Sequence, residues 1–457
     1  MDPIFNVQSF IDREKFSRFQ FMVVALCALA VLLDGFDTQA IGYVAPAIVK
    51  AWQINRSALA GVFAAGLTGL MVGALTLGPA ADRYGRKPLL AFCILFFGIF
   101  SLLTVTADTV GSLMIFRFVA GLGLGGAMPN AIALTTEYTP RRVRTTTVMI
   151  MFCGFSLGAA LGGVAAASLI AHFGWKSVFV IGGITPLLAF IALLALLPES
   201  IRYLTLKGGQ EVKIAAILRR IKPSVEIPSL PRFVVDEHKQ QGFMVGQLFK
   251  QGRALMTVLL WLVFFMSLLE LYFLSNWLPI MLHDSGVSLG SSVMITAMLQ
   301  VGGIVGTLVL GRLFDRHAPF KVLAWVYLGA AAFVFLISLV VISVPMLFVT
   351  VFGAGLCVVG AQIAANALTA GSYPTAIRST GTGWALGIGR LGSITGPIIG
   401  GALLAMQWPI TQIFMVASLP MLVAACAAFL IYLQRRGTQG LSAAPPVDVT
   451  RTAENMH

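Results

Sequence analysis

The first long apolar stretch of the chain covers residues 19–49 and reads FQFMVVALCALAVLLDGFDTQAIGYVAPAIV. It is long enough to cross a bilayer, which takes about 20 apolar residues. Its polar interruption at residues 34–39 carries two aspartates at membrane depth. A carboxylate there costs on the order of 3 kcal/mol, so both must face a water-filled cavity, a partner charge or a proton path. The stretch therefore indicates a membrane protein whose interior handles charge.

The whole chain has the composition of a membrane protein. Of its 457 residues, 58% are hydrophobic and only 11% are charged, whereas soluble domains carry roughly 25% charged residues. Apolar runs of spanning length are centred near residues 31, 69, 98, 121, 157, 185, 268, 300, 331, 358, 391 and 422. This excludes a soluble fold and predicts an all-α membrane protein with twelve transmembrane helices. The five cysteines fall within apolar segments, and we interpret them as small buried hydrophobes.

The basic residues predict the orientation of the chain. The formal net charge is +13, but the lysines and arginines are dispersed over short loops, which points to membrane topology and not to nucleic acid. With the N-terminus inside, the outside loops hold only Lys50, Arg56 and Lys176 of the 31 lysines and arginines. By the positive-inside rule, we expect both termini in the cytoplasm.

One long polar loop divides the chain in two. Within it, apolar residues at helical spacing predict a short amphipathic helix at the inner membrane surface or, alternatively, a solvated linker helix; they are Ile214, Ile217, Leu218 and Ile221. The predicted organisation is a cytoplasmic N-terminal tail (1–18), a six-helix half (19–197), a cytoplasmic linker (198–253), a second six-helix half (254–433) and a cytoplasmic C-terminal tail (434–457).

The two halves repeat each other. The sequence GPAADRYGRK at 78–87, between spans 2 and 3, recurs as GRLFDRHAPFK at 311–321, between spans 8 and 9. Almost the same shift along the sequence also aligns two glycines of span 5 with two glycines of span 11. Gly158 corresponds to Gly392, and Gly162 corresponds to Gly396. Parallel repeats of this kind place a substrate site near the midplane at their interface, and access alternates as the halves rock. The repeat therefore predicts pseudo-symmetric halves and transport.

These elements together resemble the major facilitator superfamily, in which a GxxxDRxGRK element stands between spans 2 and 3 of a six-plus-six layout. Three further segments resemble its aromatic acid:proton symporter family: DGFDTQ at 34–39, EYTP at 137–140 and GWALGIGRLG at 383–392. The resemblance implies the major facilitator fold and the proton-coupled import of aromatic carboxylates across a bacterial inner membrane. The N-terminal tail looks most like that of carriers of 4-hydroxybenzoate and protocatechuate.

Asp34 and Asp37 lie three residues apart and share one face of span 1. Arg117 lies at a comparable depth in span 4, so its guanidinium could oppose both carboxylates. Two close carboxylates do not both ionise cheaply, so one could take up a proton outside and release it inside. The alternative is a fixed Asp–Arg clamp between spans 1 and 4, and each aspartate could do one of these jobs. Glu270 of span 7 could bind a proton, contact a ring hydroxyl or pair with Arg390.

Arg390, near the middle of span 11, is the candidate partner of a substrate carboxylate. A guanidinium matches a carboxylate in a two-pronged geometry that lysine does not supply; the alternative is a bond to backbone carbonyls or to Glu270. Polar and aromatic side chains of the spans could contact a ring and its hydroxyls, or could be helix-to-helix contacts instead. These substrate-binding candidates are Trp384, Gln300, Gln362, Asn366, Tyr272, Trp277 and Phe155.

Charged residues at the inner surface are too far from the midplane to bind substrate. We expect them to form a latch that holds the outward-open state, so that removal of Asp82 slows alternation without weakening binding. The second copy of the repeat has HAP where the first has YGR, which predicts a weaker latch there. The latch candidates are Asp82, Arg83, Arg86, Lys87, Glu137, Arg141, Asp315 and Arg316.

The sequence thus predicts a proton-coupled symporter, not an enzyme, that imports hydroxylated aromatic carboxylates such as 4-hydroxybenzoate or protocatechuate. It should need no cofactor or metal, because the proton gradient drives it, and it should act as a monomer in the lipid bilayer. One alternative is a proton-coupled carrier of another acid, such as benzoate, gentisate, a shikimate-like acid or a sugar acid. A second alternative is a drug-type exporter, and the arginines within the spans count against it. A third is a membrane sensor that binds aromatic acids and signals without net transport, but the cytoplasmic segments offer no evident signalling domain.

Overall fold

The computed structural model describes residues 4–225, 232–234, 244–340, 343–373 and 377–442. Within these ranges, twelve helical spans are long and apolar enough to cross a membrane. The predicted twelve-helix membrane fold is therefore confirmed. The chain is a multi-pass membrane protein.

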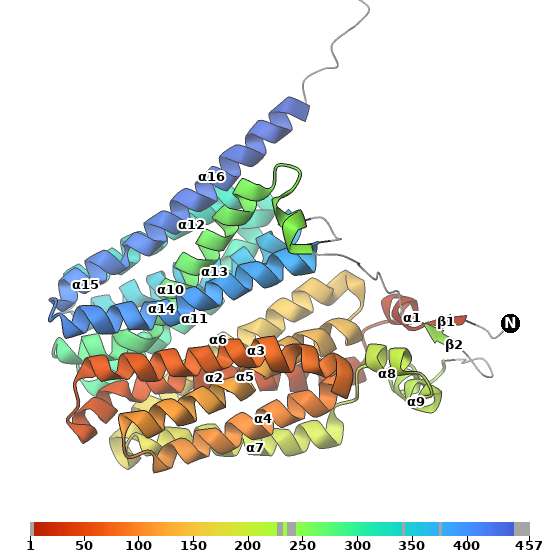
Figure 1. Ribbon diagram of the computed structural model, residues 1–457, viewed down its shortest axis with the longest axis horizontal. Helices are drawn as coiled ribbons and strands as arrows, with labels where there is room; N and C mark the ends of the chain where they lie inside the picture. Colours follow the sequence, from red (N-terminus) through yellow and green to blue (C-terminus); the bar gives the residue numbers. More distant parts are fainter. Residues whose placement is uncertain (1–3, 226–231, 235–243, 341–342, 374–376, 443–457) are drawn as a thin grey trace, which may run out of the picture.

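The spans form two groups of six helices (Figure 1). The first half consists of α2 (Arg18–Trp52), α3 (Leu59–Tyr84), α4 (Arg86–Leu103), α5 (Val110–Tyr138), α6 (Arg141–Phe173) and α7 (Lys176–Leu196). The second half consists of α10 (Ala254–Asp284), α11 (Leu289–Arg316), α12 (Pro319–Val340), α13 (Val344–Ser372), α14 (Arg378–Ala405) and a last span made of α15 (Ile410–Ala417) and α16 (Leu419–Ser442).

Glycines set the close packing inside each half. A Cβ atom at Gly158 of α6 would overlap the backbone carbonyl of Leu32 in α2. In the second half, a Cβ atom at Gly392 of α14 would overlap the backbone carbonyl of Phe265 in α10. Small residues let membrane helices approach this closely. The two glycines that the repeat aligns thus serve the same packing contact in the two halves.

Short elements gather beside one end of the first half (Figure 1). They are β1 (Ile4–Asn6), α1 (Val7–Arg13), α8 (Ile201–Lys207), α9 (Glu211–Ile221) and β2 (Arg232–Val234), with β1 and β2 paired in parallel. The sequence did not predict this strand pair. We call this end of the bundle the tail end and the opposite end the far end. Three single turns complete the fold: η1 (Arg56–Ala58), η2 (Thr104–Thr106) and η3 (Met244–Phe249).

The helix α9 corrects one interpretation of the sequence. Its apolar residues, Ile214, Ile217, Leu218 and Ile221, are all buried within the protein, in one cluster with residues of α1 and α2. Arg220 on another face lies over the ring of Phe19. The helix is therefore not a membrane-surface helix, because the protein itself covers the apolar face that would have faced lipid.

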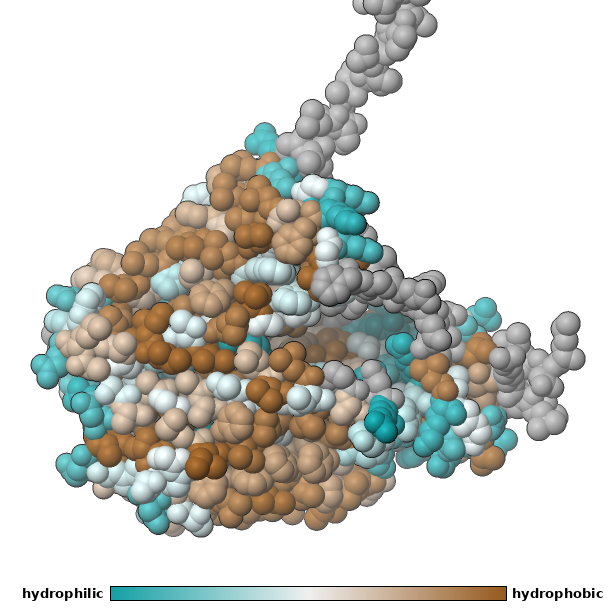
Figure 2. Space-filling view, viewed as in Figure 1, coloured by the Kyte–Doolittle hydropathy of each residue, from teal (hydrophilic) through white to brown (hydrophobic). Residues whose placement is uncertain are grey.

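The two halves touch toward the far end. Gln39 of α2 donates a hydrogen bond to Ser275 of α10, with 3.1 Å between the two side-chain atoms. Close to the far end, Gly401 of α14 packs against Ala60 of α3. Toward the tail end, the surface between the halves is hollowed (Figure 2). The interface is thus closed at the far end and opens toward the tail end.

Candidate functional site

Asp37 and Arg117 form a buried clamp at the centre of the first half. The guanidinium binds the carboxylate with two nitrogens, at 2.8 and 3.2 Å, and also donates to the backbone oxygen of Asp37 at 3.1 Å. Ser101 of α4 donates a further hydrogen bond of 2.7 Å to the same carboxylate. The guanidinium lies 5.5 Å from the ring centroid of Phe179 in α7. Four helices are therefore joined around one ion pair.

Asp34 lies one turn away and is held far more loosely. Its carboxylate accepts a hydrogen bond of 3.0 Å from Thr38 on the same helix. It is buried and lies close enough to Arg390 of the second half for their charges to interact. Arg390 in turn donates a long hydrogen bond of 3.4 Å to the hydroxyl of Tyr272. The structure thus brings Asp34, Tyr272 and Arg390 together across the junction of the halves.

A small pocket lies beside this junction. Polar groups from both halves line it, namely Thr38, Arg117, Tyr272 and Asn276, together with the apolar residues Ile41, Val62, Phe63, Leu67, Leu70 and Leu124 and the glycines Gly66 and Gly121. Its volume of about 20 Å³ suffices for about one water molecule. In this conformation the pocket is therefore too small for an aromatic ring.

Glu270 is placed differently from the aspartates. It lies on α10, fully buried, and neither carboxylate oxygen has a hydrogen-bond partner among the residues that the structure describes. The described hydrogen bonds of Arg390 do not include Glu270, so the suggested pairing of these two side chains is absent from this part of the chain. Glu270 is a carboxyl group without a counter-charge in the described ranges.

Three amide side chains of the second half also keep an unused acceptor. The side-chain oxygens of Gln300 on α11 and of Gln362 and Asn366 on α13 are buried and lack a hydrogen-bond partner among the described residues. A buried polar atom without a partner costs about 1–3 kcal/mol. These oxygens are therefore suited to accept hydrogen bonds from a ligand hydroxyl.

The four aromatic candidates lie in different places. Trp277 is fully buried, donates a hydrogen bond of 3.0 Å to the backbone oxygen of Pro397 and lies edge-on to Phe63 of the other half. Phe155 of α6 presses its backbone against Gly35. Trp384 is 44% exposed and stacks on Trp261. Tyr272 accepts the hydrogen bond from Arg390 described above.

Trp277 and Trp384 have contacts of a different kind from those that we expected. The indole of Trp277 packs between the halves, and that of Trp384 packs against α10. Among the described contacts of these two residues, none reaches Arg390. Their proposed contact with a substrate therefore has no geometric support in this conformation.

Several latch candidates form one network at the tail end. Arg86 binds Glu137 at 3.0 Å, and Ser200 donates a short hydrogen bond of 2.5 Å to the same carboxylate. Glu199 accepts hydrogen bonds from the backbone nitrogens of Arg86 and Lys87 at 2.9 and 3.1 Å, which caps α4. Asp82 and Asp315, the acidic members of the two repeats, have side chains outside the described part of the chain.

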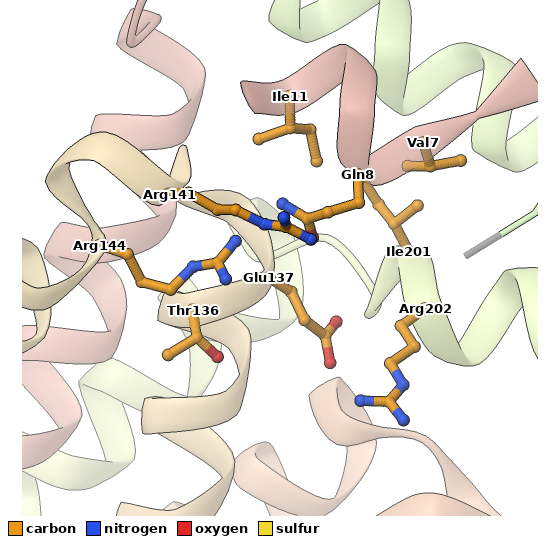
Figure 3. Close-up of a pocket in the computed structure, with 9 residues that line it drawn as sticks. All are labelled: Val7, Gln8, Ile11, Thr136, Glu137, Arg141, Arg144, Ile201 and Arg202. Atoms are coloured by element: carbon orange, nitrogen blue, oxygen red, sulfur yellow. The ribbon is translucent and has the colours of Figure 1, made fainter. Parts of the chain in front are cut away.

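A larger pocket lies in the same network, and Figure 3 shows its lining. Its volume is about 220 Å³, and Glu137, Arg141, Arg144 and Arg202 point toward it. Arg141 is paired with Asp12 of α1 at 3.1 Å. The ion pair ties the N-terminal tail to the start of α6. Of the remaining candidates, Arg83 lies over the ring of Tyr84, and Arg316 ends α11 with an exposed side chain.

Comparison with known proteins places this architecture in one family. The model of the Major Facilitator Superfamily matches residues 27–343 and 260–451. The chain belongs to the Major Facilitator Superfamily. As a member of this superfamily, it is a membrane transporter and not an enzyme, as the sequence predicted.

Two bacterial transporters are similar to this chain over nearly their whole length. The 4-hydroxybenzoate transporter of Pseudomonas aeruginosa is 42% identical over 427 residues, which cover 93% of this chain and 95% of that protein. The gallate transporter of Pseudomonas putida is 41% identical over 429 residues, with the same two coverages. A bacterial homologue of the human lysosomal transporter Spinster, solved in an inward-facing and occupied conformation, has a TM-score of 0.70, 17% identity and coverages of 91% and 97%. That last likeness concerns the fold alone.

Some residues of the site escaped the sequence analysis. Ser101 completes the binding of Asp37, Ser275 joins the two halves, and Asp12 binds Arg141. Serines in apolar runs give a weak signal, because most of them bond to the carbonyl one turn earlier. Asp12 could have been found as an acidic residue of the mixed-charge N-terminal tail, which the predicted topology puts on the same side of the membrane as the basic residues at 141–144.

Proposed function

We propose that this transporter imports hydroxylated aromatic carboxylates, such as 4-hydroxybenzoate, together with protons across a bacterial inner membrane. The observation that carries the proposal is the meeting of Asp34, Tyr272 and Arg390 where the two halves join. Such a junction near the midplane is where transporters built from repeats bind their substrates. Relatives at 42% and 41% identity bear the names of 4-hydroxybenzoate and gallate transporters, which favours the same class of substrate.

Arg390 is the proposed partner of the substrate carboxylate. It is a cation inside a membrane span, and its described side-chain hydrogen bond, to Tyr272, is a long one. Charge-assisted bonds to a carboxylate are shorter and stronger than this, so an entering anion would replace it. The unused oxygens of Gln300, Gln362 and Asn366 would then accept hydrogen bonds from ring hydroxyls. An acid without such hydroxyls would leave these oxygens unpaired.

Asp34 is the proposed proton carrier. The carboxylate of Asp37 already binds Arg117 and Ser101, which makes Asp37 the structural member of the pair. Asp34 has one hydrogen bond, from Thr38, and interacts with the charge of Arg390. When Asp34 is ionised, it competes with the substrate for this arginine; when it is protonated, it releases the arginine to the substrate. Proton uptake and anion binding would therefore favour each other.

Glu270 is the second proposed proton site. An ionised carboxylate without a partner is very costly in a dry interior, so Glu270 should carry its proton in the conformation seen here. The proposal assigns the tail end to the cytoplasm, because α1, α8 and α9 lie there, whereas Lys50, Arg56 and Lys176 stand in the last turn of α2 and at the starts of η1 and α7, at the far end. The tail-end network of Arg86, Lys87 and Glu137, with Asp82, Arg83, Asp315 and Arg316, would then act as the cytoplasmic latch. The transporter is proposed to work as a monomer.

Uptake into proteoliposomes tests the proposal. Purified protein in liposomes should accumulate radiolabelled 4-hydroxybenzoate when an inward proton gradient is imposed. Asp34→Asn and Arg390→Lys should lose this accumulation, while the control Lys176→Gln, at an exposed position of the far end, should keep it. Accumulation that survives in both site variants would contradict the assigned roles. Wild-type protein that binds the acid but does not accumulate it would contradict the transport of this acid.

A further inference from the structure

A single ion pair stands at the rim of the far end. The Nε atom of Arg56 lies 2.8 Å from a carboxylate oxygen of Asp284. Arg56 opens η1 in the first half, and Asp284 is the last residue of α10 in the second half. Of the ion pairs whose two partners are both described, this is the one that joins the halves.

Both partners are held in defined turns. The side chain of Asn55 caps η1 by accepting hydrogen bonds from the backbone nitrogen and hydroxyl of Ser57 at 3.0 and 2.9 Å. After Asp284, the chain turns at Gly286, whose φ of +94° suits a residue without a side chain. The two charges therefore meet without the ordering of long loops.

Beneath the ion pair, the halves are joined by neutral contacts. Phe63 and Trp277 lie edge to face with 5.1 Å between ring centroids, and Gln39 binds Ser275 deeper in the interface. Gly401 fits against Ala60 closely enough that a Cβ atom there would overlap it. These contacts require the two halves to fit closely together, as they do when the far end is closed.

The exposure of the pair suits a reversible contact. The side chain of Arg56 is 48% exposed and that of Asp284 is 14% exposed. Both groups can therefore be hydrated when the halves separate, whereas breaking a fully buried pair leaves a costly unpaired charge. A partly exposed ion pair can open in each cycle and still favour the closed end.

We propose that Arg56 and Asp284 form the latch that holds the far end of the transporter closed. The pair touches neither Asp34 nor Arg390 and positions the two halves without binding substrate. This inference rests on the transport function proposed above and on the assignment of the far end to the outer side. The latch forms when that end is closed and opens when the site faces outward.

Hydrogen–deuterium exchange of the purified full-length protein tests the latch without any substrate. Asp284→Asn and Arg56→Gln should each raise exchange in the far-end parts of α2 and α10, by up to about fivefold for a partly exposed ion pair. Arg56→Lys keeps the charge and should stay near wild type. The double variant Arg56→Asp with Asp284→Arg should return exchange toward the wild-type level.

A matched control separates the latch from any loss of surface charge. Lys176 and Asp108 form another exposed pair at the far end, at 4.0 Å, but both belong to the first half. Lys176→Gln should leave exchange unchanged. The latch is refuted if Asp284→Asn and Arg56→Gln behave like Lys176→Gln, or if the charge swap does not restore protection. Since the readout needs no ligand, a wrong substrate assignment would leave this test unaffected.

Discussion

The buried carboxylates of the two halves are held in opposite ways. In the first half, Asp37 is bound by two nitrogens of Arg117 and by the hydroxyl of Ser101. In the second half, Glu270 is equally buried, yet its oxygens have no partner among the described residues. Asp34 lies between these extremes, with one hydrogen bond from Thr38 and the charge of Arg390 nearby.

The difference separates structural groups from groups left free for protons or ligands. A carboxylate whose lone pairs are filled by protein donors gains little from a proton, and its removal leaves a buried cation behind. A carboxylate without donors is best kept neutral. This difference in partners favours the proposed roles, in which Asp37 is structural and Asp34 and Glu270 bind protons in the transport cycle.

The largest effect should follow from Asp37→Asn. The substitution leaves Arg117 as a buried guanidinium with a neutral partner, which typically costs about 3–5 kcal/mol. We expect a large drop in the temperature of thermal unfolding in detergent, together with poor yield. Asp34→Asn makes the same chemical change one turn away and should cost about 1 kcal/mol or less, because one hydrogen bond is affected. Equal losses in the two variants would contradict the division of roles.

The second largest effect should be a loss of substrate affinity in Arg390→Lys. Lysine keeps the charge but loses the two-pronged geometry toward a carboxylate. A charge-assisted hydrogen bond is worth about 1.5–3 kcal/mol, so 4-hydroxybenzoate should bind about 10- to 100-fold more weakly. Isothermal titration calorimetry of the purified protein measures this change. Binding of unchanged affinity would place the carboxylate elsewhere and return Arg390 to a structural role.

The fold could be predicted much further than the site. Twelve spans and the repeat depend on apolar length and on glycine positions, which are local properties of the chain. Depth counted along two antiparallel spans also brought Arg117 opposite the aspartates. Depth does not fix the rotation of a helix about its axis, however. For that reason the suggested pairing of Glu270 with Arg390 is absent among the described residues, where α10 presents Tyr272 to the arginine instead.

The rotation of a helix about its axis also decides which of two residues on one face contacts a neighbouring helix. Asp34 and Asp37 are three positions apart, so the sequence could not tell which of them meets Arg117. Packing of α2 against α5 settles it in favour of Asp37. The sequence did not reveal the packing partner of α9 either. The apolar face of α9 is equally suited to lipid or to protein, and the N-terminal residues that share its cluster lie some 200 residues earlier in the chain.

The proposed role of Asp34 predicts that substrate binding depends on pH. As the pH rises, Asp34 loses its proton, and its negative charge then competes with the substrate anion for Arg390. The affinity of the wild type for 4-hydroxybenzoate should therefore fall with rising pH, by at most about tenfold per pH unit for one linked proton. In Asp34→Asn this dependence should vanish, while exchange of labelled for unlabelled substrate continues. A variant that keeps the wild-type pH profile would move the coupled proton to another group.

The smallest change should come from Glu270→Gln, and its sign tests the comparison between the halves. Glutamine has the size of a protonated glutamate and carries no charge. If Glu270 is neutral in this conformation, the substitution should shift unfolding by less than about 1 kcal/mol, although it removes one exchangeable proton from the cycle. If Glu270 were ionised and unpaired, the same substitution would relieve a buried charge and stabilise the protein by several kcal/mol. Thermal unfolding of Glu270→Gln, measured alongside that of Asp37→Asn, distinguishes the two cases. If Glu270 is neutral, the loss of its carboxylate should hardly change the stability, whereas the loss of the Asp37 carboxylate should lower it strongly.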